Sequence, residues 1–276
     1  MSLPYISSEA GFTLLRGIMS NNISFLGIEL TLYGLFFYSG IISSVIIGSL
    51  LAKNKGIPLF DIFASCAYTM IGAIIGSKLL FILVSLKQII TFKIPFINLI
   101  KGGFVFYGGL LGGILGLYIY LKQYKLSKSD FFDIYAVALP FGHAFGRIGC
   151  FFAGCCYGVE YNGPFSVTYT ESYGMTPVGV PLLPIQILEA FCLVWIFALL
   201  LIIYLTCNKK GVTSVVYLYL YPAVRFILEF LRGDKERGIL RFLSFSQIIS
   251  LFLIISLTIF LIKKSNEIFD DEQYKR

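Results

Sequence analysis

Long apolar stretches recur along the whole of this 276-residue chain, and they constrain its fold more than any other feature. Each is about 20 residues long, enough to cross the hydrocarbon core of a bilayer as a helix. Hydrophobic residues make up 57% of the chain and charged residues only 13%, whereas soluble domains average about 25% charged residues. The sequence therefore predicts an all-α polytopic membrane protein. The short alternating segments typical of membrane β-barrels are not visible.

We expect about seven transmembrane helices in a single domain that covers residues 1–276. Their predicted bounds are 28–52, 61–86, 104–120, 131–152, 184–206, 212–231 and 245–262. The longest non-helical stretch, residues 153–183, is rich in turn-forming residues and threonines, so we expect a small extracytoplasmic head of turns or short strands there. The polar tail, residues 266–276, is expected to be frayed. No basic, cleavable leader is visible, so the first helix is expected to direct insertion.

Basic residues gather after the first, third, fifth and seventh predicted helices. Cytoplasmic loops of membrane proteins carry an excess of lysine and arginine, so these ends are expected to be cytoplasmic. The prediction is an N-terminus outside the cell and a C-terminus in the cytoplasm. The net charge of +7 then reflects topology, and we expect no nucleic acid among the partners.

Charged residues inside two of the predicted helices point to function. Arg147 follows His143 by four residues, and Tyr221, Arg225 and Glu229 are spaced i, i+4, i+8, so each set shares one helical face. A charge at membrane depth costs about 2.5–3.5 kcal/mol on insertion scales and marks a functional site by default. One interpretation is structural: a buried Arg–Glu pair and a satisfied histidine. The other is a polar wall around a cavity that binds an anion.

Three cysteines, Cys150, Cys155 and Cys156, follow Arg147 closely. A disulfide at an oxidising outer surface, a catalytic thiol, and packing of small side chains are all open interpretations. A zinc site with His143 as fourth ligand is another, but the spacing matches no common zinc pattern, and we predict no metal and no cofactor. The other cysteines lie within or at the end of apolar runs and are expected to pack as small hydrophobic residues: Cys66, Cys192 and Cys207.

Glycines and one lysine stand out in the second and third predicted helices. Gly108, Gly112 and Gly116 recur every four residues, a spacing that lets two membrane helices pack closely. Lys78 lies far from either end of the second predicted helix. It either extends its amine toward the membrane surface or adds a further cation to the cavity.

Taken together, these motifs resemble the prolipoprotein diacylglyceryl transferase family, from Tyr33-Gly34 to Gln247. The family signature, close to G-R-x-G-N-F-x-N-x-E-x-x-G, is similar to residues 146–158. Its Y-x-x-x-R-F-x-x-E-F-x-R motif resembles residues 221–232, and its P-S-Q-L-Y-E motif resembles residues 184–189. Its H-G-G element resembles residues 107–109.

The resemblance implies an enzyme of the bacterial cytoplasmic membrane that transfers the diacylglyceryl group of phosphatidylglycerol to the lipobox cysteine of a prolipoprotein, releasing glycerol phosphate. The implied partners are phosphatidylglycerol, the prolipoprotein signal peptide and the bilayer. Guanidinium groups bind phosphate bidentately, so Arg147 and Arg225 are suited to hold the phosphate of the lipid. The expected catalytic residues are Arg147, Arg225, Glu229, His143 and Tyr107. The expected phosphatidylglycerol-binding residues are Arg147, Arg225, Tyr33, Tyr221, Gly108, Gly109, Gly158 and Lys78.

Among its departures from the family pattern, three are at positions expected to matter most for the chemistry. Cys150 replaces the motif asparagine, Cys155 the motif glutamate, and Tyr107 the histidine of H-G-G. His143 is additional to the usual pattern and is a candidate general base; Tyr107 is another, although a tyrosine with a pKa near 10 is a poor base. Two alternatives stay open: a phosphatidylglycerol-dependent transferase with another acceptor, such as a glycan or small molecule, and a non-catalytic lipid-binding homologue.

Overall fold

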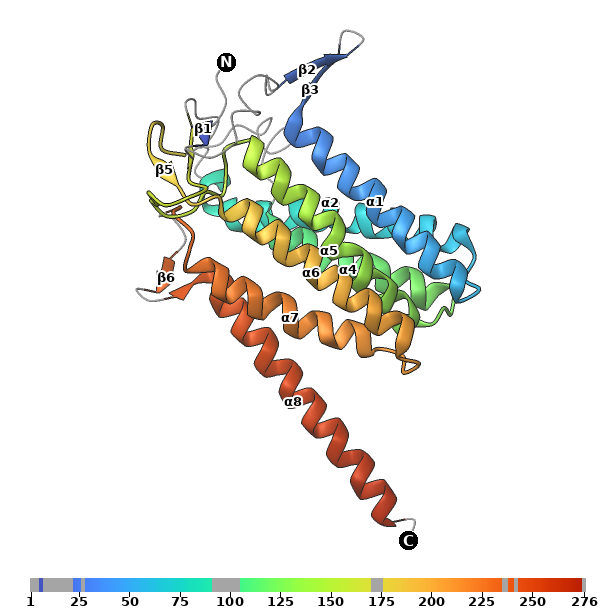
Figure 1. The fold of residues 1–276 in the computed structure, drawn as a ribbon. Helices are drawn as coiled ribbons and strands as arrows, with labels where there is room; N and C mark the ends of the chain where they lie inside the picture. The colour runs from blue at the N-terminus through green and yellow to red at the C-terminus, as the bar shows by residue number, and fades with distance from the viewer. Residues whose placement is uncertain are drawn as a thin grey trace. The chain divides into compact units, whose positions relative to one another are not determined.

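The computed structural model describes residues 5–6, 22–25, 28–90, 105–169, 176–234, 238–240 and 243–274. Seven α-helices account for most of these residues (Figure 1). They are α1 (Leu32–Asn54), α2 (Leu59–Ile90), α4 (Phe106–Gln123), α5 (Lys128–Phe152), α6 (Ile185–Thr206), α7 (Val212–Glu229) and α8 (Phe245–Tyr274). All seven predicted helices are thus confirmed as helices.

Short antiparallel strands flank the helices. The strands are β1 (Tyr5–Ile6), β2 (Asn22–Phe25), β3 (Ile28–Thr31), β4 (Val167–Thr168), β5 (Pro181–Leu182), β6 (Gly238–Leu240) and β7 (Leu243–Ser244). One sheet has the order β1-β4-β5, and the other strands pair as β2-β3 and β6-β7. β4 and β5 both lie in the connection between α5 and α6.

Two predicted helix ends are wrong. The first helix is expected to begin at Ile28, but Ile28–Thr31 pairs with β2, and α1 begins only at Leu32. In this strand the backbone N–H and C=O groups pair with those of β2 instead of along a helix. The polar tail is expected to fray, but α8 continues through it as far as Tyr274.

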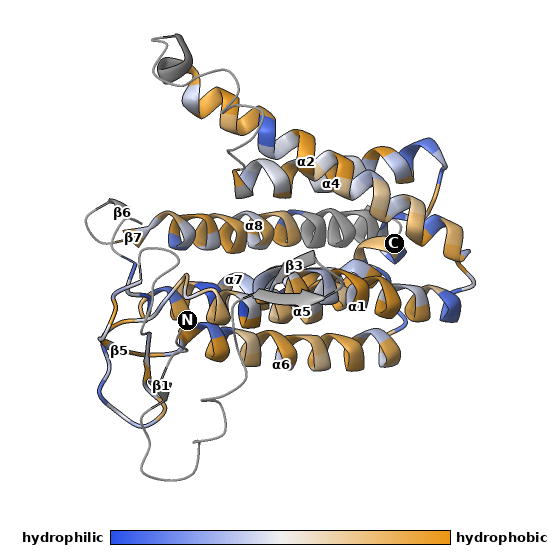
Figure 2. Cartoon of the chain, turned by 90° about the horizontal axis from the view of Figure 1, so that it is seen from above, coloured by the Kyte–Doolittle hydropathy of each residue, from blue (hydrophilic) through white to orange (hydrophobic). Residues whose placement is uncertain are grey.

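The helices are those of a polytopic membrane protein. Five of them, α1, α2, α6, α7 and α8, are long and apolar enough to cross a membrane. Their large apolar side chains are exposed to the surroundings, among them Phe60, Val84 and Trp195. Figure 2 shows hydrophobic residues over most of α6. Such extended apolar surface is rare on soluble monomers but is the expected surface toward lipid.

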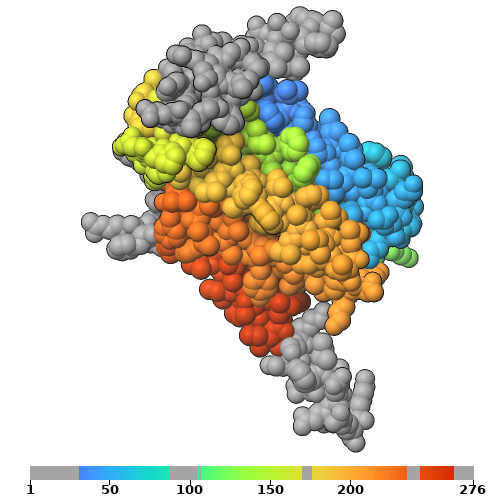
Figure 3. Space-filling model, in the orientation of Figure 1, coloured from blue at the N-terminus to red at the C-terminus, as the bar shows by residue number. Residues whose placement is uncertain are grey.

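The chain divides into two compact units. The first consists of Met1–Ser44 and Tyr135–Arg276, and the second of Val45–Ile134. In the first unit, α6 packs on α7 and α7 on α8; Figure 3 shows α6 and α7 side by side on one face. The second unit is dominated by the packing of α2 on α4.

Glycines bring α2 and α4 into backbone contact in the second unit. A Cβ atom added to Gly72 would lie 2.3 Å from the carbonyl oxygen of Gly112, and one added to Gly76 would lie 2.2 Å from that of Gly108. Gly116 is equally close to the carbonyl oxygen of Tyr68. The close packing predicted from the glycine spacing is confirmed, and it needs glycine because no larger side chain fits.

Close packing also fixes α5 within the first unit. Ser44 Oγ on α1 donates a 3.1 Å hydrogen bond to the carbonyl oxygen of Ala138 on α5. On the α6 side, Ala144 of α5 forms a buried cluster with Ala190 and Leu193. The small residues at this contact allow α5 and α6 to approach each other closely. Arg147 lies about one helical turn after Ala144 on α5, and Glu189 immediately precedes Ala190 on α6.

Candidate functional site

Two arginines from different helices converge on one buried carboxylate in the first unit. Arg147 Nη2 on α5 lies 3.0 Å from Glu189 Oε1 on α6. Arg225 Nη1 on α7 lies 3.4 Å from the same oxygen. Two helices that are far apart in the sequence thus bring both arginines to a single oxygen.

Further contacts hold Arg225 in place. Its Nη2 lies 2.5 Å from Glu229 Oε2, one turn later on α7, and donates a 3.3 Å hydrogen bond to Ser246 Oγ at the start of α8. Glu189 and Glu229 side chains are each only 4% exposed, and Arg225 is 10% exposed. The structural Arg225–Glu229 pair anticipated from the sequence therefore exists, but it forms part of a larger network over three helices.

His143 is joined to this network through Arg147. Arg147 Nε donates a 3.2 Å hydrogen bond to His143 Nε2. A nitrogen that accepts a hydrogen bond must have a free lone pair, so the imidazole is neutral in this arrangement. The ring also lies against Tyr221, with 5.6 Å between centroids. The i, i+4 face predicted on α5 and the polar face predicted on α7 therefore meet.

The network is balanced in charge and close to one end of its helices. Arg147, Arg225, Glu189 and Glu229 contribute two positive and two negative charges. Opposite charges at this depth offset much of the cost of leaving water, although buried ion pairs rarely add net stability. Arg147 is the most exposed member, at 15% of its side chain.

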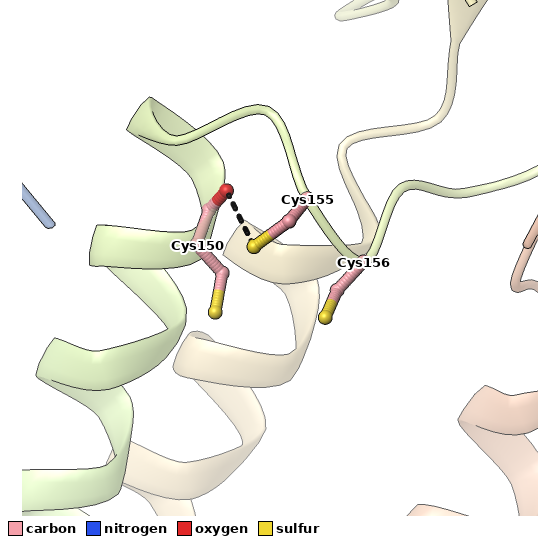
Figure 4. A group of neighbouring side chains, drawn as sticks. All are labelled: Cys150, Cys155 and Cys156. Atoms are coloured by element: carbon pink, nitrogen blue, oxygen red, sulfur yellow. Dashed lines mark hydrogen bonds between the residues drawn. The ribbon is translucent and has the colours of Figure 1, made fainter. Parts of the chain in front are cut away.

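A three-cysteine cluster lies at the end of α5 and in the loop that follows (Figure 4). The Sγ atoms of Cys150, Cys155 and Cys156 all lie within 4.8 Å of one another. Cys155 Sγ donates a weak 3.7 Å hydrogen bond to the carbonyl oxygen of Cys150, and Gln186 Nε2 on α6 donates a 2.8 Å hydrogen bond to the carbonyl oxygen of Cys155. No disulfide joins the cysteines in the part of the chain that the structure describes.

Arg232 stands beside this loop. It forms a two-fold hydrogen bond with Asp234, both distances being 3.1 Å, and its backbone pairs with that of Gly158. Burial alone would lower the pKa of Arg232, but the hydrogen bond and charge of Asp234, together with Cys156, raise it. The hydrogen bonds among the three thiols lower the pKa of Cys156 and raise the pKa of Cys155.

The remaining predicted site residues fall in three places. Tyr33, on α1 of the first unit, has its backbone oxygen beside Gly149. Gly158 is pressed against the carbonyl oxygen of Leu183, where a side chain does not fit. Four others belong to the second unit: Tyr107, Gly108, Gly109 and Lys78. Gly109 faces Ser77 of α2 as Gly108 faces Gly76, so helix packing accounts for both glycines, and their substrate role stays a prediction.

Four residues of the candidate site are not among the site residues expected from the sequence: Glu189, Gln186, Ser246 and Arg232. Glu189, Gln186 and Arg232 lie in the motifs that carry the family resemblance, where no role was assigned to them. Glu189 and Gln186 are spaced i, i+3 in an otherwise apolar helix, and both are almost fully buried. Polar residues at this depth are rare and functional by default. That rule, applied to the fifth apolar stretch as it was to the fourth and sixth, would have found Glu189.

Comparison with known proteins gives a consistent result. A family model described as prolipoprotein diacylglyceryl transferase matches residues 21–263. The phosphatidylglycerol–prolipoprotein diacylglyceryl transferase of Clostridium tetani is 36% identical over 234 residues, which cover 83% of this chain and 91% of that protein. Transferase 2 of Clostridium perfringens is 34% identical over 232 residues, with 83% and 89% covered. The Finegoldia magna transferase is 28% identical over 254 residues, with 91% and 97% covered.

Proposed function

Because the chain belongs to the prolipoprotein diacylglyceryl transferase family, we propose that it transfers the diacylglyceryl group of phosphatidylglycerol to the lipobox cysteine of prolipoproteins in the bacterial cytoplasmic membrane. The sulfur of the acceptor attacks the glycerol carbon that carries the phosphate. A C–S bond forms, the C–O bond to phosphate breaks, and glycerol phosphate leaves with the electron pair. The thiol proton passes to a general base.

The convergence of Arg147 and Arg225 on Glu189 Oε1 is the observation that supports this chemistry best. An oxygen held by two guanidinium groups, at 3.0 and 3.4 Å, marks a position suited to a phosphate oxygen. Both arginines then stabilise the negative charge that grows on the leaving phosphate. In the proposed reaction a phosphate oxygen replaces Glu189 Oε1 as the partner of both arginines, and Arg147 turns away from Glu189 toward it.

Binding of the phosphate also has a consequence for His143. Its Nε2 is engaged by Arg147 Nε in this structure. When Arg147 turns toward the lipid phosphate, that lone pair becomes available to accept the thiol proton of the acceptor. We assign the general base to His143 on this ground, and the positioning of Arg225 to Glu229 and Ser246.

The orientation follows from the same residues. Arg147 and Arg225 lie near the last turns of α5 and α7, Glu189 near the first turn of α6, and Ser246 at the start of α8. Lysines gather beyond the opposite ends of α1 and α6, at Lys53, Lys55, Lys209 and Lys210. Positive charge favours the cytoplasmic side, so we propose that the arginine network lies toward the outer side, with the N-terminus outside and the C-terminus in the cytoplasm.

A transfer assay tests the proposal. Purified protein is incubated with vesicles that contain labelled phosphatidylglycerol and with a lipobox peptide; a peptide whose cysteine is replaced by serine is the control. We expect label on the cysteine peptide alone, with one glycerol phosphate released for each peptide. Release of glycerol phosphate without peptide labelling would favour a different acceptor. The replacements of family residues at Cys150, Cys155 and Tyr107 would then account for the changed acceptor. If neither labelled peptide nor glycerol phosphate forms, the result would favour a non-catalytic lipid-binding protein.

A further inference from the structure

The three-cysteine cluster takes no part in the transfer reaction above, yet its geometry is that of a ligand set. Cys150, Cys155 and Cys156 come from two short segments, and their sulfurs all lie within 4.8 Å of one another. Figure 4 shows the three side chains gathered around the space between the end of α5 and the following loop. We propose that the cluster binds one thiophilic d10 cation, Zn²⁺, as three thiolates.

The distances suit such an ion. With Zn–S bonds of about 2.3 Å, sulfurs around a tetrahedral zinc ion are about 3.8 Å apart. The sulfurs are now at most 4.8 Å apart, and rotation of the side chains on an unchanged backbone would shorten these distances to about that value. A disulfide would use only two of the three sulfurs and would leave the third without a role. Soft thiolate ligands favour zinc and cuprous ions over hard cations such as Mg²⁺.

The backbone of the loop is held in the conformation that presents the cysteines. Cys156 has a φ of 58° and Gly154 a φ of 65°, the left-handed region, which costs a non-glycine residue about 1–3 kcal/mol. Surrounding hydrogen bonds hold this conformation. Gln186 binds the Cys155 carbonyl oxygen at 2.8 Å, and backbone bonds of 3.0 Å join Gly233 to Tyr157 and Val159 to Leu231. The ligands are therefore arranged before any ion arrives.

Charge and access also fit. Three thiolates with Zn²⁺ carry a net charge of −1, and the guanidinium of Arg232, which also pairs with Asp234, interacts electrostatically with Cys156. All three cysteines are only half-buried, so an ion can enter and a solvent molecule can take the fourth position. Binding releases the remaining thiol protons to solvent. His143 is not a ligand in this arrangement, because its Nε2 accepts the hydrogen bond from Arg147.

The sequence alone predicts no metal, because the spacing of these cysteines matches no common zinc pattern. The structure changes that inference. The left-handed turn at Gly154 and Cys156 brings together sulfurs that a linear motif would not suggest. The proposal does not depend on the transferase activity, since it concerns only side chains outside the arginine network.

A zinc-binding measurement tests it. The full chain, purified in detergent, reduced and stripped of metal, is titrated with Zn²⁺ against a chromophoric chelator, without lipid or peptide. We expect one zinc ion per chain. Changes of the residues around a metal site typically weaken metal affinity by about 10–100-fold. We expect at least this loss from each of three single substitutions: Cys150→Ser, Cys155→Ser and Cys156→Ser. The matched control carries serine at Cys66, Cys192 and Cys207, the three cysteines outside the cluster, and should bind as the unmodified chain does.

A second readout needs no substitution and so does not depend on the folding of variants. Zinc should protect the three cluster cysteines from alkylation, as measured by mass spectrometry of their peptides, and should leave the other three equally reactive. The proposal is overturned if no stoichiometric zinc binds. It is also overturned if the control loses binding as the cluster variants do, or if the cluster is isolated as a disulfide that binds no zinc after reduction.

Discussion

Arg147 donates a hydrogen bond through Nε to His143 and forms an ion pair through Nη2 with Glu189. One guanidinium thus couples a histidine on its own helix to a carboxylate on another. Any movement of Arg147 changes both partners together. The proposed mechanism uses this coupling: the phosphate that draws Arg147 away from Glu189 also frees the imidazole that accepts the thiol proton.

Replacement of His143 by glutamine separates the two roles open to this residue. The glutamine oxygen still accepts a hydrogen bond from Arg147 but cannot take up a proton at neutral pH. If His143 is the base, turnover falls by about 10²–10⁴-fold, and the pH profile of kcat loses one ionisation, while KM for phosphatidylglycerol changes little. Near-normal turnover with an unchanged pH profile would reduce His143 to a positioning residue.

Arg147→Ala and Arg225→Ala test the phosphate site. Each removes one of two cations from the growing charge on phosphate, so we expect kcat to fall by at least about 10²–10³-fold. Lysine variants at the same positions keep the charge but lose the forked geometry, and we expect intermediate losses. Lys53→Ala, in the last turn of α1 and outside the arginine network, is the control and should keep full turnover. Near-normal activity of either alanine variant would exclude that arginine from the site.

Glu189→Gln tests whether the carboxylate holds the place of the phosphate. Its removal leaves Arg147 and Arg225 with an uncompensated positive charge. Breaking a buried pair by removing one partner costs about 3–5 kcal/mol, so thermal stability in detergent should fall. Soluble glycerol phosphate should restore part of the lost stability in the variant and much less in the unmodified chain. Equal stabilisation of both would contradict the idea that Glu189 and phosphate compete.

Two neighbouring glycines of α4 give a matched test of helix packing. A Cβ atom at Gly112 would lie 2.2 Å from the carbonyl oxygen of Gly72, whereas at Gly113 the nearest atom is 3.4 Å away. Gly112→Ala should destabilise the protein by about 1–3 kcal/mol through overpacking. Gly113→Ala should be neutral or stabilise by up to about 1 kcal/mol, because alanine favours helix. Thermal unfolding in detergent measures both, and equal effects would be inconsistent with the packing described.

The helices and part of the site were predictable from local features. Apolar runs located all seven helices, and the spacing of Gly108 and Gly112 predicted a close helix contact, because both are properties of one segment. The i, i+4 relation between His143 and Arg147 placed them on one face for the same reason. The start of α1 was missed because a β-strand pairing at Ile28 depends on a partner segment.

Relationships between helices were not predictable in the same way. Glu189 lies in a stretch that reads as almost wholly apolar, and nothing in its neighbours indicates that two arginines reach it. The cysteine cluster depends on the left-handed backbone at Cys156, a conformation that its sequence does not favour. In both cases the decisive information is which side chains meet in space.

The glycine contact between α2 and α4 also limits how lipid moves. Where Gly72 and Gly76 meet Gly108, Gly112 and Gly116, not even one methyl group can be added between the two backbones. A methylene of an acyl chain is no smaller, so this seam is closed to lipid tails. An acyl chain that contacts these two helices must therefore lie on their outer faces.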